Sequence, residues 1–133
     1  MNDFPPIGPR FPLTLAESTD RGRCLMTLAD IPQGATIETA PVQVLPTELA
    51  RYIDSYRLDF FVSWDPPDVD KTLALPLGLF GLCNHSDSPN AMLSIDYSRR
   101  LVYLLALTTI TINSEITIAY KDASGSYSSA GHK

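Results

Sequence analysis

The sequence predicts a domain that is mainly β, with one or two short helices. Short runs of apolar and β-branched residues, such as LTLAES and ATIETAPVQVL, alternate with turn signals such as Pro32-Gln33-Gly34. The chain has 133 residues, of which 44% are hydrophobic, so it is long enough to bury one core. We therefore expect one globular domain with short tails.

The first half of the chain is predicted to be an arm followed by strands. Residues 1–12 hold four prolines and two phenylalanines, which favours an extended arm that lies against the body. One short helix is expected at about residues 47–55, because Thr47 offers a helix start and apolar residues follow it at helical spacing. Strands are expected in the segments LTLAES, RCLMTLADI and ATIETAPVQVL.

The second half is also predicted to be β. DFFVSW is aromatic and branched enough for a strand, and KTLALPLGLF is expected to return as an extended segment. MLSIDY and RLVYLLAL flank Ser98-Arg99 as the two strands of a hairpin would. LALTTITI favours strand through its threonines and isoleucines, and TIAY follows a polar break. Residues 121–133 are small and polar, so we expect them to be flexible.

The charge and composition exclude several classes of protein. The formal net charge is -5 and no basic run is present, which argues against nucleic acid as the main ligand and fits a basic peptide better. No stretch approaches the ~18 consecutive apolar residues of a membrane helix, and the N-terminus lacks a signal-peptide layout, so we expect a soluble, unprocessed protein. The two cysteines, Cys24 and Cys83, are interpreted as reduced, buried thiols.

Amide, imidazole and hydroxyl groups come together in NHSDSPN, directly after the apolar run LFGLC. Read alone, this segment favours a structural turn with a hydrogen-bonded histidine, because Asn, Ser and Asp make turns through their side chains and Pro89 fixes the backbone. A zinc site on Cys83 and His85 would need further ligands, and the only other histidine is His132. The same pair as nucleophile and base would need an orienting group that the sequence does not identify.

The order of three further stretches changes this interpretation. The loop Gly22-Arg23-Cys24-Leu25 precedes ADIPQGATI, NHSDSPN follows in mid-chain, and SEITIAY closes the folded region. Together these segments resemble the SET-domain protein-lysine methyltransferases, whose pattern is a G-x-G loop, then D-I-P-x-G-x-x-I, N-H-S-x-x-P-N and G-E-E-[IL]-T-x-x-Y. The resemblance spans residues 13–120. Because long insertions are absent, the chain is similar to the small single-domain members found in viruses and bacteria.

The resemblance implies the fold and its subdivision. We expect a SET fold of the β-clip type, with several short curved sheets and a segment threaded through a knot-like core. An extended arm over residues 1–12 would lead into a SET domain over residues 13–120. A variable insert would occupy about residues 46–75, and a flexible tail would follow at residues 121–133.

The resemblance also implies S-adenosylmethionine as methyl donor and S-adenosylhomocysteine as product. No metal is expected, because the sequence offers too few ligands. Tyr120 is the implied catalytic residue, because its hydroxyl would orient the methyl group. Asn84 would face the amino-acid part of the cofactor, and His85 would use its backbone groups toward adenine. The implied cofactor-binding residues are Arg23, Cys24, Leu25, Asn84, His85 and Tyr120. The expected substrate channel consists of Tyr56, Leu93, Tyr103, Ile118 and Tyr127.

The chain departs from the family pattern at three places. Cys24 stands where the second loop glycine is usual, and Asn113-Ser114-Glu115 replaces Gly-Glu-Glu, although asparagine can adopt a left-handed turn much as glycine does. The family's cysteine-rich zinc segment after the final tyrosine is missing from this sequence. The replaced loop glycine and the missing segment motivate the alternative hypothesis of a catalytically inactive SET-fold binding module.

The implied partner is a protein or peptide that carries a target lysine, with a histone or histone-like basic protein as one candidate and a ribosomal protein as another. No direct contact with nucleic acid or a membrane is expected. We expect a homodimer, because DFFVSW could form an exposed apolar surface. The expected location is the cytoplasm in a bacterium, or the nucleus and chromatin in a eukaryotic cell.

Overall fold

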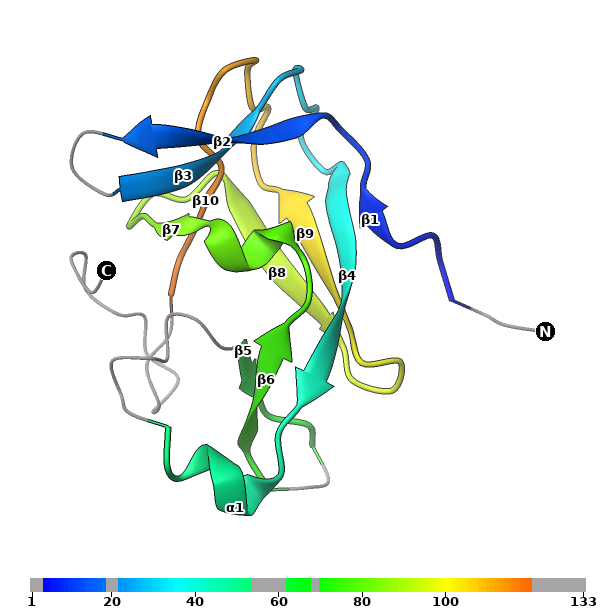
Figure 1. Ribbon diagram of the computed structural model, residues 1–133. Coiled ribbons are helices and arrows are strands. Elements are labelled where there is room, and N and C mark those ends of the chain that lie inside the picture. Colours follow the sequence, from blue (N-terminus) through cyan, green and yellow to red (C-terminus); the bar gives the residue numbers. More distant parts are fainter. Residues whose placement is uncertain (1–3, 19–21, 54–61, 68–69, 121–133) are drawn as a thin grey trace.

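The computed structural model describes residues 4–18, 22–53, 62–67 and 70–120 (Figure 1). This part of the chain is mainly β, with one α-helix and one 3-10 helix, which confirms the predicted fold class. No helix in it is long and apolar enough to cross a membrane. The elements in chain order are β1 (Gly8–Pro9), β2 (Leu13–Ser18), β3 (Gly22–Thr27), β4 (Thr36–Val44), α1 (Thr47–Ala50), β5 (Val62–Trp64), β6 (Thr72–Pro76), η2 (Leu79–Leu82), β7 (Asn84–His85), β8 (Ala91–Asp96), β9 (Leu101–Ala106) and β10 (Thr117–Ile118).

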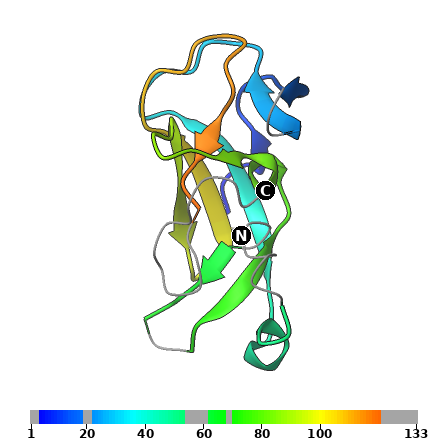
Figure 2. The same cartoon turned by 90° about the vertical axis from the view of Figure 1, so that its left-hand side faces the viewer.

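The main sheet is organised around the long strand β4. Its strand order is β5-β6-β4-β9-β8, all adjacent pairs are antiparallel, and β1 also pairs with β4. The first part of β4 pairs with β9, and its last residues pair with β6. Figures 1 and 2 show α1 at the far end of the molecule from the β2–β3 pair. The sheet therefore connects the insert at one end to the small sheets at the other.

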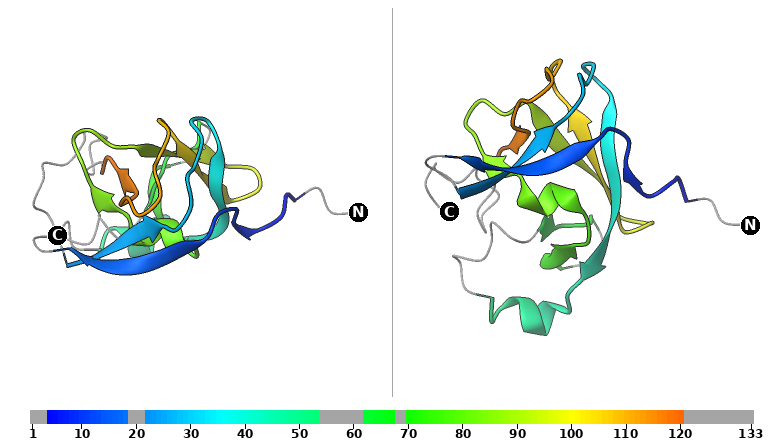
Figure 3. Two further views of the ribbon diagram at one scale, coloured as in Figure 1. Left: turned by 90° about the horizontal axis from the view of Figure 1, so that it is seen from above. Right: turned by 45° about the horizontal axis from the view of Figure 1, so that its top comes forward.

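Two small sheets complete the fold at the end away from α1. β2 and β3 form an antiparallel pair that passes over η2, and β7 and β10 form a parallel pair (Figure 3). The chain approaching β10 also bonds to the free edge of β3, because the Ile116 N–H donates to the Leu25 carbonyl at 2.8 Å and Met26 bridges Glu115. The last described segment thus runs first along β3 and then along β7.

The core lies between the main sheet and these small sheets. Its apolar residues come from most of the strands and from η2, whereas α1 contributes no buried residue. Trp64 packs edge-to-face on Tyr97, with ring centroids 4.8 Å apart. The largest fully buried apolar side chains are Phe80, Leu25, Ile31, Ile37, Leu104, Ile110 and Ile116.

The structure confirms most of the expected strands and corrects three boundaries. The predicted hairpin is present as β8 and β9. LALTTITI is not a continuous strand: β9 ends at Ala106, and Ile110 forms an isolated bridge with Ile31 instead of continuing β9. KTLALPLGLF is not extended throughout, because its last residues begin η2. The predicted helix begins at Thr47 but ends at Ala50.

A buried carboxylate explains the turn into η2. Glu38 on β4 is 2% exposed, and its two oxygens accept the backbone N–H groups of Leu79 and Phe80, each at 2.8 Å. Gly78 lets the chain approach this group, since a β-carbon there would lie 2.4 Å from that of Ala40. Orphan N–H groups at the start of a helix need acceptors, and Glu38 provides them from a strand 41 residues earlier.

Asp96 organises the turn of the β8–β9 hairpin. Its Oδ1 accepts hydrogen bonds from the Arg99 backbone N–H at 3.1 Å and from the Ser98 hydroxyl at 3.0 Å. The bond from the Arg99 backbone is the main cause that holds the pKa of Asp96 below its ordinary value of 3.8. Because folding lowers this pKa, the ionised carboxylate stabilises the turn at pH values above 3.8. This stabilisation is lost as the pH falls through the lowered pKa.

We predict that Glu38→Gln destabilises the protein. A glutamine retains one acceptor, but its amide NH₂ would face the second backbone N–H, and one buried unpaired donor costs about 1–3 kcal/mol. Urea unfolding followed by circular dichroism measures this change. Glu48→Gln is the matched control, because Glu48 is exposed on α1. Equal stability of the Glu38→Gln protein and the control would contradict the role of Glu38.

Candidate active site

The segment NHSDSPN begins as a buried strand held between two other segments. Asn84 and His85 form β7, which pairs in parallel with Thr117 and Ile118 of β10. The Ser86 N–H extends this pairing by donating to the Ile118 carbonyl at 2.9 Å. The apolar run LFGLC before it contains the 3-10 helix η2 and is not a strand. Asn84 and His85 are therefore buried in the core directly after a 3-10 turn.

The Asn84 side chain connects three segments. Its Nδ2 donates to the Arg23 carbonyl at 3.1 Å and to Oε2 of Glu115 at 2.8 Å. Asn84 is 1% exposed, and its Oδ1 has no hydrogen-bond partner. Among the side chains that the structure describes, only this atom and Oγ1 of Thr39 are buried without a partner, and Thr39 lies on β4. The site thus contains a buried acceptor that the described protein groups do not satisfy.

The His85 imidazole is used at both nitrogens. Nδ1 accepts the backbone N–H of Tyr120 at 2.9 Å, and Nε2 lies 2.9 Å from Oδ1 of Asp87. Since an amide N–H can only donate, the neutral ring must carry its proton on Nε2 and donate it to Asp87. This arrangement leaves neither nitrogen for zinc, and no three potential ligands cluster in the described part of the chain.

Tyr120 is held at two points by the segment that contains β7. Its backbone N–H bonds to His85, and its hydroxyl donates to the Cys83 carbonyl at 2.5 Å. The residue is 6% exposed, and its ring lies 5.4 Å from that of His85 between centroids. The hydroxyl therefore has a defined place beside the backbone that leads into Asn84.

Asn90 fixes the approach to β10 by acting as a substitute peptide group. Its Nδ2 donates to the Glu115 carbonyl at 2.8 Å, and its Oδ1 accepts the Thr117 N–H at 2.9 Å. These two bonds pair the Asn90 side chain with the backbone on either side of Ile116, on the edge opposite to β7. Asn90 consequently anchors both Glu115, which binds Asn84, and the strand that ends at Tyr120.

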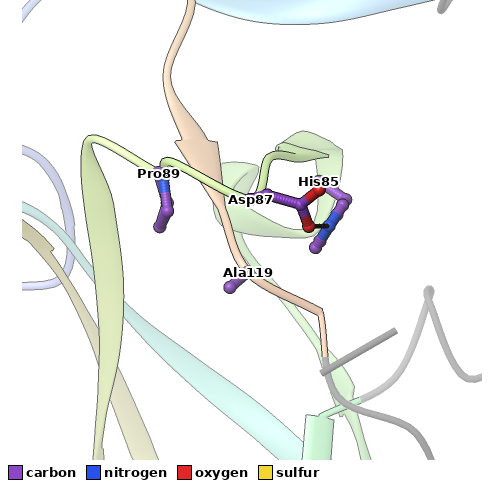
Figure 4. Close-up of a pocket in the computed structure, with 4 residues that line it drawn as sticks. All are labelled: His85, Asp87, Pro89 and Ala119. Carbon is purple, nitrogen blue, oxygen red and sulfur yellow. Dashed lines mark hydrogen bonds and ion pairs between the residues drawn. The ribbon is translucent and has the colours of Figure 1, made fainter. Parts of the chain in front are cut away.

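A cavity lies beside these residues. It has a volume of about 310 Å³ and is lined by His85, Asp87, Pro89 and Ala119. Figure 4 shows the His85–Asp87 interaction on one side of it and Pro89 and Ala119 on the other. Its volume is at the lower end of the range for small-molecule sites, and its lining is mostly apolar.

The loop expected to bind the cofactor belongs to β3 and lies next to Asn84. Arg23 is exposed and contributes its carbonyl to Asn84, whereas Leu25 is 1% exposed and belongs to the core. Cys24 is 5% exposed and lies within the regular strand, and the left-handed φ of +74° falls on Gly22 instead. The backbone at Cys24 therefore accepts a side chain. Asn113 has the left-handed φ of +68° that the sequence predicted.

The residues expected to line the substrate channel are not all brought together. Leu93 pairs with Leu104 and packs on the core, while Tyr103 pairs with Ser94 and so lies on the opposite face of the hairpin. Ile118 is buried beside His85. Tyr56 and Tyr127 lie outside the described residues.

Three residues with defined roles in this cluster were not predicted as site residues. Asp87 and Asn90 belong to NHSDSPN, and Glu115 belongs to SEITIAY, so the motifs contained them. Their partners are 2, 25 and 31 residues away. Membership of these two motifs was therefore the sequence signal that could have identified the three residues. Their hydrogen-bond partners could not be predicted from the sequence.

The comparison with protein-family models matches the SET domain over residues 22–121, which include the β3 loop, β7 and Tyr120. The chain belongs to the SET-domain family. This SET-domain chain is 27% identical over 115 residues to a Schizosaccharomyces pombe protein named "Histone-lysine N-methyltransferase, H3 lysine-37 specific". The match covers 85% of this chain and 76% of that relative. These findings make the chain a protein of the lysine-methyltransferase class.

Solved structures confirm that the architecture is the SET fold. A Plasmodium falciparum protein described as a histone methyltransferase is 26% identical and superposes with a TM-score of 0.66, covering 82% of this SET-domain chain and 92% of the other. A Neurospora SET-domain histone lysine methyltransferase superposes with a TM-score of 0.68 at 20% identity. The match covers 84% of this chain and 52% of the Neurospora chain, so this chain spans about half of that structure.

The surface proposed for a homodimer is only partly described. Val62 and Trp64, from DFFVSW, are 8% and 4% exposed and belong to the core of their own chain. Residues 59–61 of that segment lie outside the described part. The two described apolar side chains thus do not form a dimer surface, and the homodimer stays a prediction.

We predict that Asn90→Ala destabilises this cluster by about 1–3 kcal/mol, because the Glu115 carbonyl and Thr117 N–H lose their partly buried partner. Chemical unfolding gives the change in stability. Hydrogen exchange at the Thr117 amide locates the effect, since this amide should exchange faster. Thr108→Ala is the control, because Thr108 is exposed. A Thr117 amide as protected as in the unmodified protein would rule out this role of Asn90.

Proposed function

We propose that this SET-domain protein transfers methyl groups from S-adenosylmethionine to the side-chain amine of a lysine in a protein substrate. The observation that carries the proposal is the unpaired Oδ1 of Asn84, which is fixed beside the β3 loop in a chain of the lysine-methyltransferase class. An acceptor in this setting fits a ligand that brings a donor. The β7 and β3 segments meet here, as a cofactor site shared by both would require.

The residues present fit the amino-acid part of the cofactor. A carbonyl oxygen such as Oδ1 of Asn84 is a suitable acceptor for an ammonium group, and its pairing would remove a penalty of about 1–3 kcal/mol. Residues of the β3 loop, Arg23 and Cys24, would contribute backbone groups, as would Asn84 and His85 of β7. The apolar cavity beside Pro89 and Ala119 suits a flat ring such as adenine.

The cofactor, when bound, supplies the methyl group as a sulfonium. The protein must provide a neutral lysine amine, whose deprotonation at pH 7 costs about 4.6 kcal/mol from a pKa near 10.4. Buried apolar side chains around the site, such as Ile118 at 8% exposure, disfavour a charged amine and reduce that cost. The remaining requirement is the alignment of the reacting atoms.

Tyr120 is the proposed catalytic residue. Its hydroxyl is buried, and in this structure it bonds to the Cys83 carbonyl, so its position is set by backbone atoms. A hydroxyl held in this way can orient a reacting group without first losing side-chain freedom. The carbonyl of Cys83 is placed at the same point and would share this task as an acceptor.

The proposed substrate is a basic segment of a protein, and a histone is the first candidate. The names of the Schizosaccharomyces pombe and Plasmodium falciparum proteins refer to histone methylation. The net charge of -5 fits a basic partner because opposite charges steer association. In a eukaryotic cell this substrate would place the protein at chromatin. The direct test is incubation with labelled S-adenosylmethionine and core histones, followed by identification of labelled lysines.

The alternative is a SET-fold module that has lost catalysis. It was motivated by Cys24 in the loop and by the missing cysteine-rich segment. Of these, Cys24 occupies an ordinary strand position here. Titration calorimetry with S-adenosylmethionine separates the two proposals. An inactive module that has lost the site gives neither binding heat nor methylated product.

We predict that Tyr120→Phe lowers kcat by about 10²–10³, while the affinity for the cofactor changes by less than about tenfold. The phenyl ring still fills the buried space, so the fold should be retained, but the hydroxyl is lost. Single-turnover assays and calorimetry on the same preparation measure the two quantities. Full turnover by the Tyr120→Phe protein would show that Tyr120 only packs.

We predict the opposite pattern for Asn84→Asp. An aspartate keeps an oxygen acceptor but replaces the Nδ2 donor, and it would repel Glu115, so the fixed orientation of the acceptor is lost. Cofactor affinity should fall at least about tenfold. The double variant Asn84→Asp with Glu115→Gln removes the repulsion and should recover part of this affinity. Wild-type affinity of the single variant would exclude Asn84 from the cofactor site.

A further inference from the structure

The exposed carboxylate of Asp87 lies against a buried imidazole. The side chain of His85 is 4% exposed, whereas that of Asp87 is 79% exposed, and their Nε2 and Oδ1 atoms are 2.9 Å apart. Asp87 lies at the rim of the cavity, on a turn that Pro89 follows (Figure 4). A surface residue is therefore bonded to a group that holds Tyr120 from within the core.

The two partners of His85 require the same tautomer. The Tyr120 N–H can only donate, so Nδ1 must be unprotonated, and the ionised Asp87 can only accept, so Nε2 must carry the proton. A hydrogen bond to an ionised group is also stronger than a neutral one. Together the two bonds fix both the ring orientation and the position of its proton.

We infer that Asp87 is a positioning residue that acts on Tyr120 through His85. This inference rests on the proposed function, because it assigns Tyr120 its catalytic role. If the His85 ring turned, the Tyr120 N–H would lose this acceptor. The backbone beyond Ile118, which stays paired with β7, would then be less constrained, and so would the Tyr120 side chain. Asp87 thus limits movement of Tyr120 although it does not touch it.

The alternative is that Asp87 contacts a ligand in the cavity directly. Asp87 lines that cavity, and its second oxygen has no described partner. A direct contact predicts a change in cofactor affinity without any change at His85 or Tyr120. The two ideas therefore differ in measurements on the protein without ligand.

The first measurement is nuclear magnetic resonance of the full chain labelled with ¹⁵N-histidine. The protein has two histidines, so a His132→Gln variant assigns the His85 signals. We expect one protonated and one unprotonated ring nitrogen in the unmodified protein. Asp87→Ala should add a population of the other tautomer and raise the exchange rate of the Tyr120 amide about tenfold. Asp87→Asn, whose carbonyl can still accept the Nε2 proton, should restore the unmodified behaviour.

The second measurement is turnover in the same variants. Asp87→Ala should lower kcat about ten- to a hundredfold, because small misplacements of a catalytic group have effects of that size. Its cofactor affinity should stay within about threefold of the unmodified protein. Ser88→Ala is the control, since Ser88 is exposed in the same turn and its side chain has no described contact with His85.

Each outcome decides the inference. An unchanged tautomer and an unchanged Tyr120 amide in Asp87→Ala would overturn it, and would mean that water replaces the carboxylate. Weaker cofactor binding with an undisturbed Tyr120 amide would assign Asp87 to the cavity as a ligand contact. If no lysine is methylated by the unmodified protein, the proposed function fails, but the resonance experiment still establishes whether Asp87 holds Tyr120.

Discussion

One side-chain amide, that of Asn84, brings together the three segments on which the site depends. Its two protons reach the Arg23 carbonyl, 61 residues away, and the Glu115 carboxylate, 31 residues away. Closing loops of these lengths costs entropy, which has to be recovered by bonds made after closure. Both hydrogen bonds are partly buried, so loss of the amide would take a partner from two acceptors at once. The order of β3, β7 and the strand ending at Tyr120 thus depends on a single residue.

The position of Tyr120 follows from that arrangement. Backbone pairing of β10 with β7, the His85 imidazole and the Cys83 carbonyl all come from one short segment. A hydroxyl defined by backbone contacts moves with the fold as a whole, whereas one held by long side chains would sample many positions. The fold therefore supplies the alignment that methyl transfer to an amine requires.

The sequence predicted what depended on local pattern and motif order, and failed where a distant residue decides the structure. Alternation predicted the β8–β9 hairpin because a one-residue shift would expose its apolar face. The end of β9 was missed, since Leu107 is as apolar as the residues of β9, and Ile110 beyond it pairs with the distant Ile31. Likewise, the 3-10 turn at Leu79 depends on Glu38. Asn84, His85 and Tyr120 were predicted, but the bonds that orient them were not.

The unpaired oxygen of Asn84 distinguishes this site from a purely structural network. Buried polar groups in folded proteins nearly always have partners, so an orphan acceptor needs an explanation. The amide cannot rotate to satisfy it, because rotation would turn Oδ1 toward Arg23 and Glu115, which are both acceptors. The fold accordingly keeps this oxygen in place at a cost of about 1–3 kcal/mol, which a ligand with a donor would recover on binding. An acceptor prepared in advance in this way loses little freedom when the ligand arrives, which favours binding at this point of the fold.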